Sequence, residues 1–583
     1  MASKHLHDDP AALPLQYLHG LAVLNPDLSV DESHKVLHKR NHDRNTVAVI
    51  SGGGSGHEPA HAGFVGQGML SAAVAGNVFA SPNARQIRRA LTLVDNEKGT
   101  LVVVKRYTGD VLQFGLAGES VPGNVEFLVV GDDVAVGRKQ GAIVGRRGLA
   151  GVTLVYKVAG YLAQQGLALD EIRRVASLVA SNVGTIGSSL AHCHVPGTET
   201  EESTLQSDEL EIGTGIHNEP GLLKLRPVPS ASELVERMVA LLTATDDPDR
   251  SFLSFKGDGK DSIVLMINNL GGISELELVA LVTPILAAFA RRGISVARLL
   301  TGTFMSSLDM SGFSITACLL PRDVDSDVIL QALDGSTDAP GWRKSSVPLP
   351  KPTITPPAAG LAPSPPSGLS APVPQDFIAA IRSACHRVIA AEPEITRYDV
   401  IAGDGDCGLT LTSGAEGVLK AIEDGSIDGG DITNSIKRIG AVIEDRMGGT
   451  SGALYAIFFA GLAQELSSQT GQTSPAIWSN ALSAAFNKLC QYTSARPPSR
   501  TLVDPLAAFT EVLAANPHQL AEAAKSAKDA ALNTAKLVAS AGRAAYVDQA
   551  ALQEEDVPDP GAWGLTILFE GIHASVAGSG GAQ

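Results

Sequence analysis

The feature that most limits the fold is a short apolar segment that runs directly into a glycine-rich turn. Residues 46–50 (Thr-Val-Ala-Val-Ile) have the β-branched composition of a buried strand. Four of the five residues 52–56 are glycines, so bare backbone follows the carboxyl end of this strand, where open α/β folds bind ligands. Glycine N–H groups can approach a small polar ligand closely. His57 and Glu58 follow at once, which places reactive side chains beside the turn.

Other interpretations of this turn exist. The simplest is an ordinary glycine turn with solvated His57 and Glu58. A Walker loop is excluded because no Gly-Lys-Ser/Thr occurs, and the dinucleotide fingerprint fails because Pro59 stands where its last glycine should be. His57-Glu-Pro-Ala-His61 matches the zinc-protease pattern, but proline is tolerated only in a first helical turn. The two histidines therefore do not share one face of a regular helix, and zinc hydrolysis is disfavoured.

Composition limits the class of protein. A chain of 583 residues should contain more than one domain. Its net charge of −17 argues against a nucleic-acid-binding surface, although a local cationic pocket or a metal could still hold an anionic substrate. The apolar stretch 278–290 is too short to span a bilayer, so no membrane association is expected. No signal peptide is apparent and the five cysteines are widely spaced, so we expect a cytoplasmic protein.

The sequence predicts an α/β domain over residues 1–344. Apolar runs such as Leu101–Val104 and Ile263–Ile267 alternate there with helical patterns, as in layered α/β folds. The acidic segment 197–208 suggests a division into two α/β lobes. These lobes would cover about residues 1–196 and 209–344.

A second domain is predicted after residues 345–375, which are rich in Pro, Ala and Ser and are typical of a semi-rigid linker. Beyond the linker the strand signal disappears. Residues 376–583 therefore predict an all-α bundle of roughly seven to nine helices. The helical patterns cover residues 377–391, 414–423, 432–444, 453–466, 476–489, 520–540 and 563–574.

The helical domain contains a carboxylate cluster. Asp399, Asp404 and Asp406 lie within eight residues and are separated by glycines. Such carboxylates would repel one another unless a cation joined them, and oxygen ligands favour Mg²⁺ or Ca²⁺. An EF-hand is excluded because its spacing does not continue. An Asx-Gly turn without a metal is the alternative.

Two further turns in this domain begin helices. Residues 447–452 (Met-Gly-Gly-Thr-Ser-Gly) offer N–H and hydroxyl groups that suit phosphate oxygens, and a plain helix N-cap is the alternative. Pro558-Asp-Pro-Gly561 is the other turn. A metal turn beside a phosphate-binding turn suggests a nucleotide held through Mg²⁺.

The α/β domain carries two more polar segments. Lys105–Asp110 follows a predicted strand, and His217 is framed by glycines within residues 212–221. A lone histidine is usually structural, but a glycine-rich loop that ends in Asn-Glu-Pro-Gly favours a functional one.

Six motifs occur in order along nearly the whole chain. They are Gly-Gly-Gly-Ser-Gly-His-Glu-Pro-Ala-His-Ala-Gly (52–63), Tyr-Thr-Gly-Asp (107–110), Gly-Ile-His-Asn-Glu-Pro-Gly (215–221), Gly-Thr-Phe-Met-Ser-Ser-Leu-Asp-Met (302–310), Gly-Asp-Gly-Asp-Cys-Gly (403–408) and Gly-Gly-Thr-Ser-Gly-Ala-Leu-Tyr (448–455). Together they resemble the single-chain form of the ATP-dependent dihydroxyacetone kinases (glycerone kinases). The resemblance implies phosphorylation of dihydroxyacetone, and of D-glyceraldehyde, by ATP.

The resemblance also implies roles for individual residues of the α/β domain. His217 matches the histidine that adds covalently to the substrate carbonyl and forms a hemiaminal. His57 and Asp110 match the pair that handles protons. The positions that hold the substrate hydroxyls correspond to Gly54, Ser55, Gly56, His57, Lys105 and Asp110.

In the helical domain the resemblance implies that Asp399, Asp404 and Asp406 bind two Mg²⁺ ions that bridge the ATP phosphates. The residues that match nucleotide contacts are Cys407, Gly408, Leu409, Thr410, Thr450, Ser451, Thr501, Leu502, Arg543, Pro558, Asp559 and Pro560. The resemblance further implies a homodimer, in which the helical domain of one chain could serve the acceptor site of the other, and a role in glycerol metabolism.

The chain departs from the family pattern at several positions. Arg106 and Gln113 replace asparagines, Tyr156 replaces a common histidine, and Ser499 lies in Arg-Pro-Pro-Ser-Arg instead of Arg-Pro-Gly-Asp-Arg. None of these changes removes a residue of the implied catalytic set.

Three alternative functions are open. Some relatives cleave FAD to cyclic FMN and AMP at the helical domain. Subunits of related systems act as partners of transcription regulators, which the intact aspartates and His217 argue against. A phosphoenolpyruvate-fed system is disfavoured because such kinases keep the two domains on separate subunits.

Overall fold

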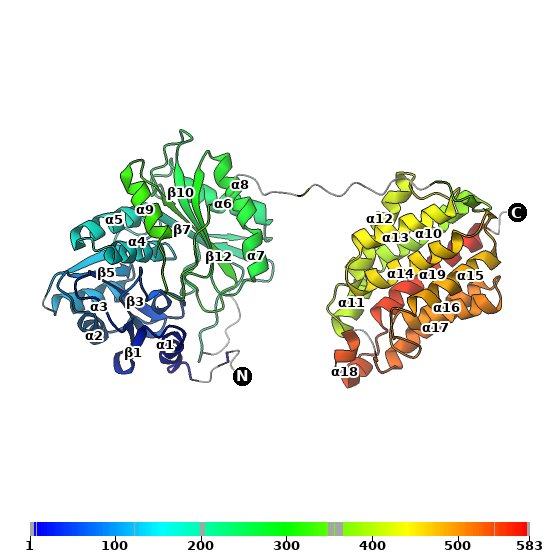
Figure 1. Cartoon of the computed structure of the whole chain (residues 1–583), viewed down its shortest axis with the longest axis horizontal. Coiled ribbons are helices and arrows are strands. Elements are labelled where there is room, and N and C mark those ends of the chain that lie inside the picture. Colours follow the sequence, from blue (N-terminus) through cyan, green and yellow to red (C-terminus); the bar gives the residue numbers. More distant parts are fainter. Residues whose placement is uncertain are drawn as a thin grey trace. The chain divides into compact units, whose positions relative to one another are not determined.

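The computed structural model shows two compact units, Met1–Ile354 and Thr355–Gln583, each of which is described by itself (Figure 1). The structure describes residues 5–6, 9–121, 123–198, 205–347, 355, 365–540, 543–547 and 549–579. Most of the predicted linker 345–375 lies outside the described residues.

A six-stranded sheet forms the first part of the α/β unit, with the strand order β1-β2-β4-β3-β5-β6. The four strands β4, β3, β5 and β6 are parallel to one another, whereas β2 runs antiparallel to both β1 and β4. Its strands are β1 (Leu28–Asp31), β2 (Val36–Lys39), β3 (Ala48–Ser55), β4 (Ala72–Val78), β5 (Thr100–Lys105) and β6 (Val125–Val130).

Helices cover both faces of this sheet because its central strands are apolar on both sides. Leu101 and Val103 of β5 pack in one core with α1, α4 and α5, while Val102 and Val104 pack in another with α2 and α3. A continuous apolar run is the pattern of a parallel strand that is buried on both faces. The helices are α1 (Leu13–Leu24), α2 (Ala84–Leu93), α3 (Thr108–Glu119), α4 (Val152–Gln164) and α5 (Leu169–Ser181).

The second sheet has the order β11-β10-β12-β7-β8-β9, and only its β10–β11 pair is parallel. Its strands are β7 (Val183–Ser189), β8 (Leu210–Ile212), β9 (Leu223–Leu225), β10 (Ser262–Asn269), β11 (Ser295–Gly302) and β12 (Gly312–Leu319). The second sheet thus begins before the acidic segment 197–208. The division between the sheets lies between β6 and β7, earlier than the lobe boundary that we expected.

One face of the second sheet is covered by α6 (Ala231–Thr243), α7 (Glu275–Ala280) and α8 (Val282–Arg291). Its other face joins the core of the first sheet, because Val264 and Met266 of β10 cluster with residues of α4 and α9 (Val324–Asp334). The two sheets therefore share one hydrophobic core.

The helical unit is a ring of packed helices around an apolar core, and α19 packs against α10 to close it (Figure 1). The described residues of this unit hold ten α-helices, three of which (α11, α16 and α18) fall outside the helical patterns read from the sequence. A two-residue strand pair, Leu369–Ser370 with Gly471–Gln472, was not predicted either. The helices are α10 (Pro374–Ala390), α11 (Glu392–Ala402), α12 (Cys407–Glu423), α13 (Ile432–Arg446), α14 (Gly449–Leu466), α15 (Pro475–Leu489), α16 (Val503–Ala515), α17 (Leu520–Asn533), α18 (Gln549–Glu554) and α19 (Pro560–Ser579). Within the described part of the chain, no helix has the length and apolar character needed to cross a bilayer.

The close packing of α4 gives a stability prediction. A Cβ built at Gly160 would overlap the backbone of Met69, which cannot move as a flexible side chain could. We expect Gly160→Ala to lower the free energy of unfolding of the α/β unit by at least about 1–3 kcal/mol, because overpacking forces backbone shifts. Gly20→Ala is the control, since no atom lies within 4 Å of a Cβ there and alanine favours a helix. The free energy of unfolding of both variants would be measured by calorimetry. Equal stability of Gly160→Ala and Gly20→Ala would contradict the prediction.

Candidate active site

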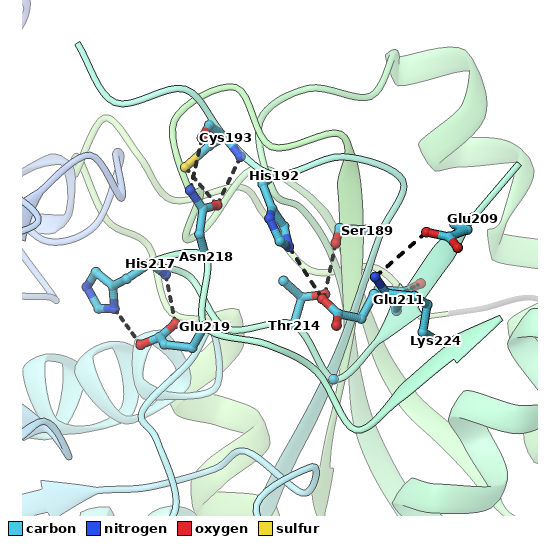
Figure 2. A network of polar contacts seen from close by, with 12 residues as sticks. Ser189, His192, Cys193, Glu209, Glu211, Thr214, His217, Asn218, Glu219 and Lys224 are labelled. Carbon is cyan, nitrogen blue, oxygen red and sulfur yellow. Dashed lines mark hydrogen bonds and ion pairs between the residues drawn. The ribbon is translucent and has the colours of Figure 1, made fainter. Parts of the chain in front are cut away.

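Two histidines from distant parts of the α/β unit meet beside the first sheet. His57 follows β3, and His217 lies in the loop between β8 and β9. Their Nε2 atoms are 3.0 Å apart. The Nδ1 atom of His57 lies 3.0 Å from the carbonyl oxygen of Ser306, and Nδ1 of His217 lies 3.0 Å from the carboxylate of Glu219, as Figure 2 shows for the second pair. Each imidazole is thus held from its far side.

The partners of these rings determine their tautomers. A carbonyl oxygen and a carboxylate can only accept, so both Nδ1 atoms carry hydrogen; this assignment follows from the hydrogen bonds, not from observed protons. Both Nε2 atoms then direct lone pairs to the same point, or share one additional proton. Burial lowers the pKa of His57 well below its ordinary value, and the charge of Lys105 adds to this. A neutral base therefore faces a second imidazole that can act as a nucleophile.

The loop that carries His217 is fixed by its neighbours. Asn218 has a left-handed backbone (φ 63°) and exchanges two hydrogen bonds with Cys193: the Cys193 N–H donates to Oδ1 at 3.0 Å, and Nδ2 donates to the Cys193 carbonyl at 2.9 Å (Figure 2). Glu219 also accepts from the His217 N–H at 2.9 Å. Burial alone would raise the pKa of Glu219, but the hydrogen bonds and charge of His217 lower it to about 2. Glu219 is therefore ionised and can stabilise positive charge on the His217 ring.

Several buried polar atoms around the two histidines have no hydrogen-bond partner in the described part of the chain. They are His61 Nε2, Tyr107 OH and Asp110 Oδ1. The Tyr107 ring meets the His217 ring edge-on at 4.7 Å, and Lys105 Nζ lies 5.1 Å from the centre of the Tyr107 ring. Buried polar atoms are normally paired. Unpaired ones at this position suit a small polar ligand.

Lys105 and Asp110 belong to the same cluster. Lys105 ends β5 and is 1% exposed, and Asp110 lies in the first turn of α3 and is 3% exposed. Burial lowers the pKa of Lys105, while the charge of Asp110 opposes this shift. The pair keeps a cation and an anion next to the histidines with little water.

The glycine turn itself is already engaged within the protein. The Ser55 hydroxyl donates to the Gly76 carbonyl at 2.9 Å, and the Gly56 N–H donates to the Glu58 carboxylate at 2.8 Å. A Cβ at Gly54 would overlap the backbone of residues 79–80, so only glycine fits there. Gly54 therefore positions the turn by close packing, and Ser55 keeps its oxygen lone pairs for a donor from a ligand.

His61 is a site residue that sequence reasoning missed. The Ser51 hydroxyl donates to Tyr156 OH at 2.8 Å, and Tyr156 OH lies 2.8 Å from His61 Nδ1. Tyr156 then donates to Nδ1, which leaves the hydrogen of His61 on Nε2 beside Gly53. Tyr156, which stands where the family commonly has histidine, thus affects the two-histidine site through its hydrogen bond to His61. The spacing of these two residues along the chain does not reveal this contact.

In the helical unit, Asp399, Asp404 and Asp406 come together. One carboxylate oxygen from each lies within 4.8 Å of the others. Asp399 is in the last turn of α11 and accepts from the Cys407 N–H at 2.9 Å. Burial raises the pKa of Asp399, and the charges of Asp404 and Asp406 raise it further. Three oxygen donors that repel one another fit a hard divalent cation.

The helix starts beside this cluster suit phosphate. α12 begins at Cys407 directly after Asp406, and α14 begins at Gly449. Ser451, in the first turn of α14, is hydrogen-bonded to Cys407, so the two helix N-termini adjoin. Helix N-termini bind anions through free N–H groups. Four other predicted nucleotide contacts lie here. Thr450 is exposed and Leu409 is 61% exposed, so both side chains face solvent. Gly408 packs on Thr396, and the Thr410 N–H donates to the Asp406 carbonyl at the start of the helix.

The remaining predicted nucleotide contacts lie at the starts of α16 and α19. The Thr501 N–H donates to Asp504 at 2.8 Å, and Leu502 is buried. Asp559, between Pro558 and Pro560, accepts from the Ala562 N–H at 2.8 Å, and burial raises its pKa to about 6. The side chain of Arg543 lies outside the described residues.

Arg500 was also missed, although it ends the altered Arg-Pro-Pro-Ser-Arg motif. Its side chain is among the most buried in the protein, at 1% exposed. Nη2 donates to the Val557 carbonyl at 3.0 Å, while Nε and Nη1 have no partner in the parts of the chain that are described. A buried guanidinium with free donors suits an anionic ligand.

Comparison with known proteins first defines the class. The Dak1 domain model matches residues 19–341 and the DAK2 domain model matches residues 401–574, so the chain is a two-domain Dak protein. It is 41% identical to the dihydroxyacetone kinase of Komagataella pastoris over 98% of both chains, and 36% identical to the triokinase/FMN cyclase of Homo sapiens over 98% of this chain and 99% of that one. The crystal structure of the C. freundii dihydroxyacetone kinase with AMP-PNP and Mg²⁺ matches with a TM-score of 0.61 and 30% identity, over 98% of this chain and all of that one. The chain therefore belongs to the dihydroxyacetone kinase family.

The aspartate cluster gives a prediction on pH and metal. Because the folded state raises the pKa of Asp399, its ionisation costs stability, and the helical unit should become less stable as pH rises above the ordinary aspartate value of about 3.9. Mg²⁺ should reverse this loss by binding the ionised form. We expect a Mg²⁺-dependent rise in melting temperature that Asp399→Asn removes and Asp529→Asn, an exposed control, retains. An equal Mg²⁺ effect in all three proteins would contradict a metal site at this cluster.

Proposed function

We propose that this chain transfers the γ-phosphoryl group of ATP to a hydroxyl of dihydroxyacetone, and also of D-glyceraldehyde. The observation that carries the proposal is the convergence of His57 Nε2 and His217 Nε2 at 3.0 Å among unpaired polar atoms. The relatives named dihydroxyacetone kinase support the same substrate. In this proposal the α/β domain (1–344) binds the acceptor and the helical domain (376–583) binds the nucleotide.

The acceptor step begins at His217. Its Nε2 lone pair forms a bond to the carbonyl carbon, the carbonyl π electrons move to oxygen, and that oxygen takes a proton from a solvent water molecule to give a hemiaminal. The positive charge that develops on the ring is shared with Glu219 through Nδ1–H. Such a reversible bond orients a very small substrate, which offers few other contacts. It also excludes glycerol, which has no carbonyl group.

The phosphoryl step requires a proton acceptor for the attacking hydroxyl. His57 Nε2 is a neutral base because burial depresses its pKa, and Asp110 has an unpaired buried oxygen. Together they would take the hydroxyl proton as the oxygen attacks the γ-phosphorus in line, while the bond from this phosphorus to the β–γ bridging oxygen breaks and ADP leaves. Two Mg²⁺ ions held by Asp399, Asp404 and Asp406 would neutralise phosphate charge when bound.

The nucleotide side is proposed on the features described above. The N–H groups at the starts of α12 and α14, with Thr450 and Ser451, would hold phosphate oxygens. The free donors of Arg500 add a cation at the same end of the bundle, since Asp559 interacts with Arg500 and Asp399. We further propose that the protein acts in the cytoplasm as a homodimer and serves glycerol metabolism; sedimentation of the intact protein tests the dimer.

The decisive variant is His217→Ala. We expect turnover with dihydroxyacetone, ATP and Mg²⁺ but none with glycerol, and a loss of at least about a hundredfold in kcat/KM in the variant, because covalent orientation contributes several kcal/mol. His386→Ala, an exposed histidine on α10, is the matched control and should retain full activity. A loss smaller than about tenfold in His217→Ala would rule out covalent positioning.

A second activity is proposed for the helical unit: cleavage of FAD to cyclic FMN and AMP. The supporting observation is that mammalian relatives 36–38% identical over 98% of this chain are named triokinase/FMN cyclase. We expect cyclic FMN from FAD and Mn²⁺ by chromatography. Asp404→Asn should abolish it, whereas His217→Ala should leave it unchanged. If the wild-type kinase formed no cyclic FMN, this second activity would be wrong.

A further inference from the structure

A second pocket of the α/β unit lies outside the two-histidine site. It has a volume of about 380 Å³ and adjoins the end of β6 and the last turn of α5. We call it the arginine pocket, and its polar and glycine lining consists of Arg106, Gly131, Gly145, Arg146, Ser177 and Ser181. Pockets of this size bind small molecules.

The two arginines of this pocket lack counterions. In the described ranges neither Arg106 nor Arg146 forms an ion pair, and Arg106 donates no side-chain hydrogen bond. Arg146 makes one long hydrogen bond, 3.4 Å, to the Asp132 carbonyl, and its guanidinium lies 4.2 Å from the centre of the Phe252 ring. A Cβ at Gly145 would collide with the Arg106 guanidinium, so this glycine makes room for that group.

The nearby acidic side chains already have partners other than Arg106 and Arg146. Asp133 is ion-paired to Arg147 at 2.6 Å, and the Asp132 carboxylate accepts from the N–H groups of Leu149 and Gly151 and from Thr185. Burial lowers the pKa of Arg146, and the charges of Asp132 and Asp133 oppose this shift, while those of Arg138 and Arg106 add to it. The pocket therefore carries an excess of positive charge, although the whole chain has a net charge of −17.

One feature opposes an anion here. The carboxyl-terminal end of α5 contributes about half a negative charge. Two full guanidinium charges outweigh it. The Ser181 hydroxyl already donates to the Leu178 carbonyl at 3.0 Å, so Ser177 is the lining hydroxyl that can turn toward a ligand. Guanidinium groups match the tetrahedral oxygens of phosphate in bidentate geometry. The volume admits a small ester and excludes a folded polymer.

We propose that the arginine pocket binds the phosphate group of a small phosphorylated metabolite, in the size range of a triose phosphate. Arg106 directly precedes Tyr107, which contacts His217, and Arg146 directly precedes Arg147, which donates to the Gly213 carbonyl at 2.7 Å in the loop that carries His217. On two chain segments, therefore, an arginine of this pocket is followed directly by a residue that contacts His217 or its loop.

The test is equilibrium binding to the full-length protein by calorimetry, which needs no turnover and so does not depend on the proposed kinase activity. The probes are inorganic phosphate and glycerol 3-phosphate, a three-carbon ester without the carbonyl group that His217 would attack, with AMP-PNP and Mg²⁺ present to occupy the nucleotide site. Arg106 is exposed, so we expect Arg106→Gln to fold normally. Arg85 is an exposed arginine on α2, and Arg85→Gln is the matched control.

We expect Arg106→Gln, and Arg106→Gln with Arg146→Gln, to weaken binding at least about tenfold, because each removes a charge-assisted hydrogen-bond donor. Arg85→Gln should bind as the wild type does. An equal loss of affinity for both probes would identify phosphate itself as the recognised group. A loss of affinity for the ester alone would show that the pocket also contacts its organic part. Either outcome supports the proposal. Wild-type protein that binds neither probe, or Arg106→Gln that binds both normally, would overturn the proposal.

Discussion

The 3.0 Å approach of the His57 and His217 Nε2 atoms is the contact on which the acceptor site depends. The rings are oriented for this contact by anchors on their far sides, the Ser306 carbonyl for His57 and the Glu219 carboxylate for His217. The two rings and their two anchors come from three separate segments, after β3, after β8 and after β11. The site is therefore a product of the whole α/β unit, and removal of one anchor would release a ring without changing the fold.

The shared core explains how three segments can be held to such accuracy. β3 lies in the first sheet, whereas β8 and β11 lie in the second. If the sheets were independent lobes, motion between them would separate His57 from His217. Instead, α4 packs between them and its residues cluster with β10 of the second sheet and β5 of the first. Close packing resists such motion, so the burial of α4 preorganises the chemistry.

Sequence reasoning succeeded where the signal was local and failed where it depended on contacts across the fold. The α/β and all-α character followed from periodicity and was confirmed by the structure and its relatives. His61 and Arg500 were not singled out, because their importance lies in partners 95 and 57 residues away and in nitrogens that remain without a partner in the described part of the chain. Glu219 was also not singled out, although its partner His217 is only two residues away, because the orientation of its side chain cannot be read from the sequence. The boundary between the sheets was misplaced because an acidic loop within the second sheet resembles a linker in composition.

Electrostatics reconciles an acidic chain with anionic substrates. A net charge of −17 would repel ATP at long range, but salt screens this field beyond about 10 Å. Within that range the relevant charges are few and local. They are Lys105 at the proposed acceptor site, Arg500 and the helix N-termini at the proposed nucleotide site, and Arg106 with Arg146 in the arginine pocket. Arg500 leaves two guanidinium nitrogens without a partner in the described part of the chain, and Arg146 makes one long hydrogen bond; unsatisfied buried donors cost stability in the free protein. An anion bound at the proposed nucleotide and phosphate sites would offset that cost, which is the physical reason for placing those sites at these residues.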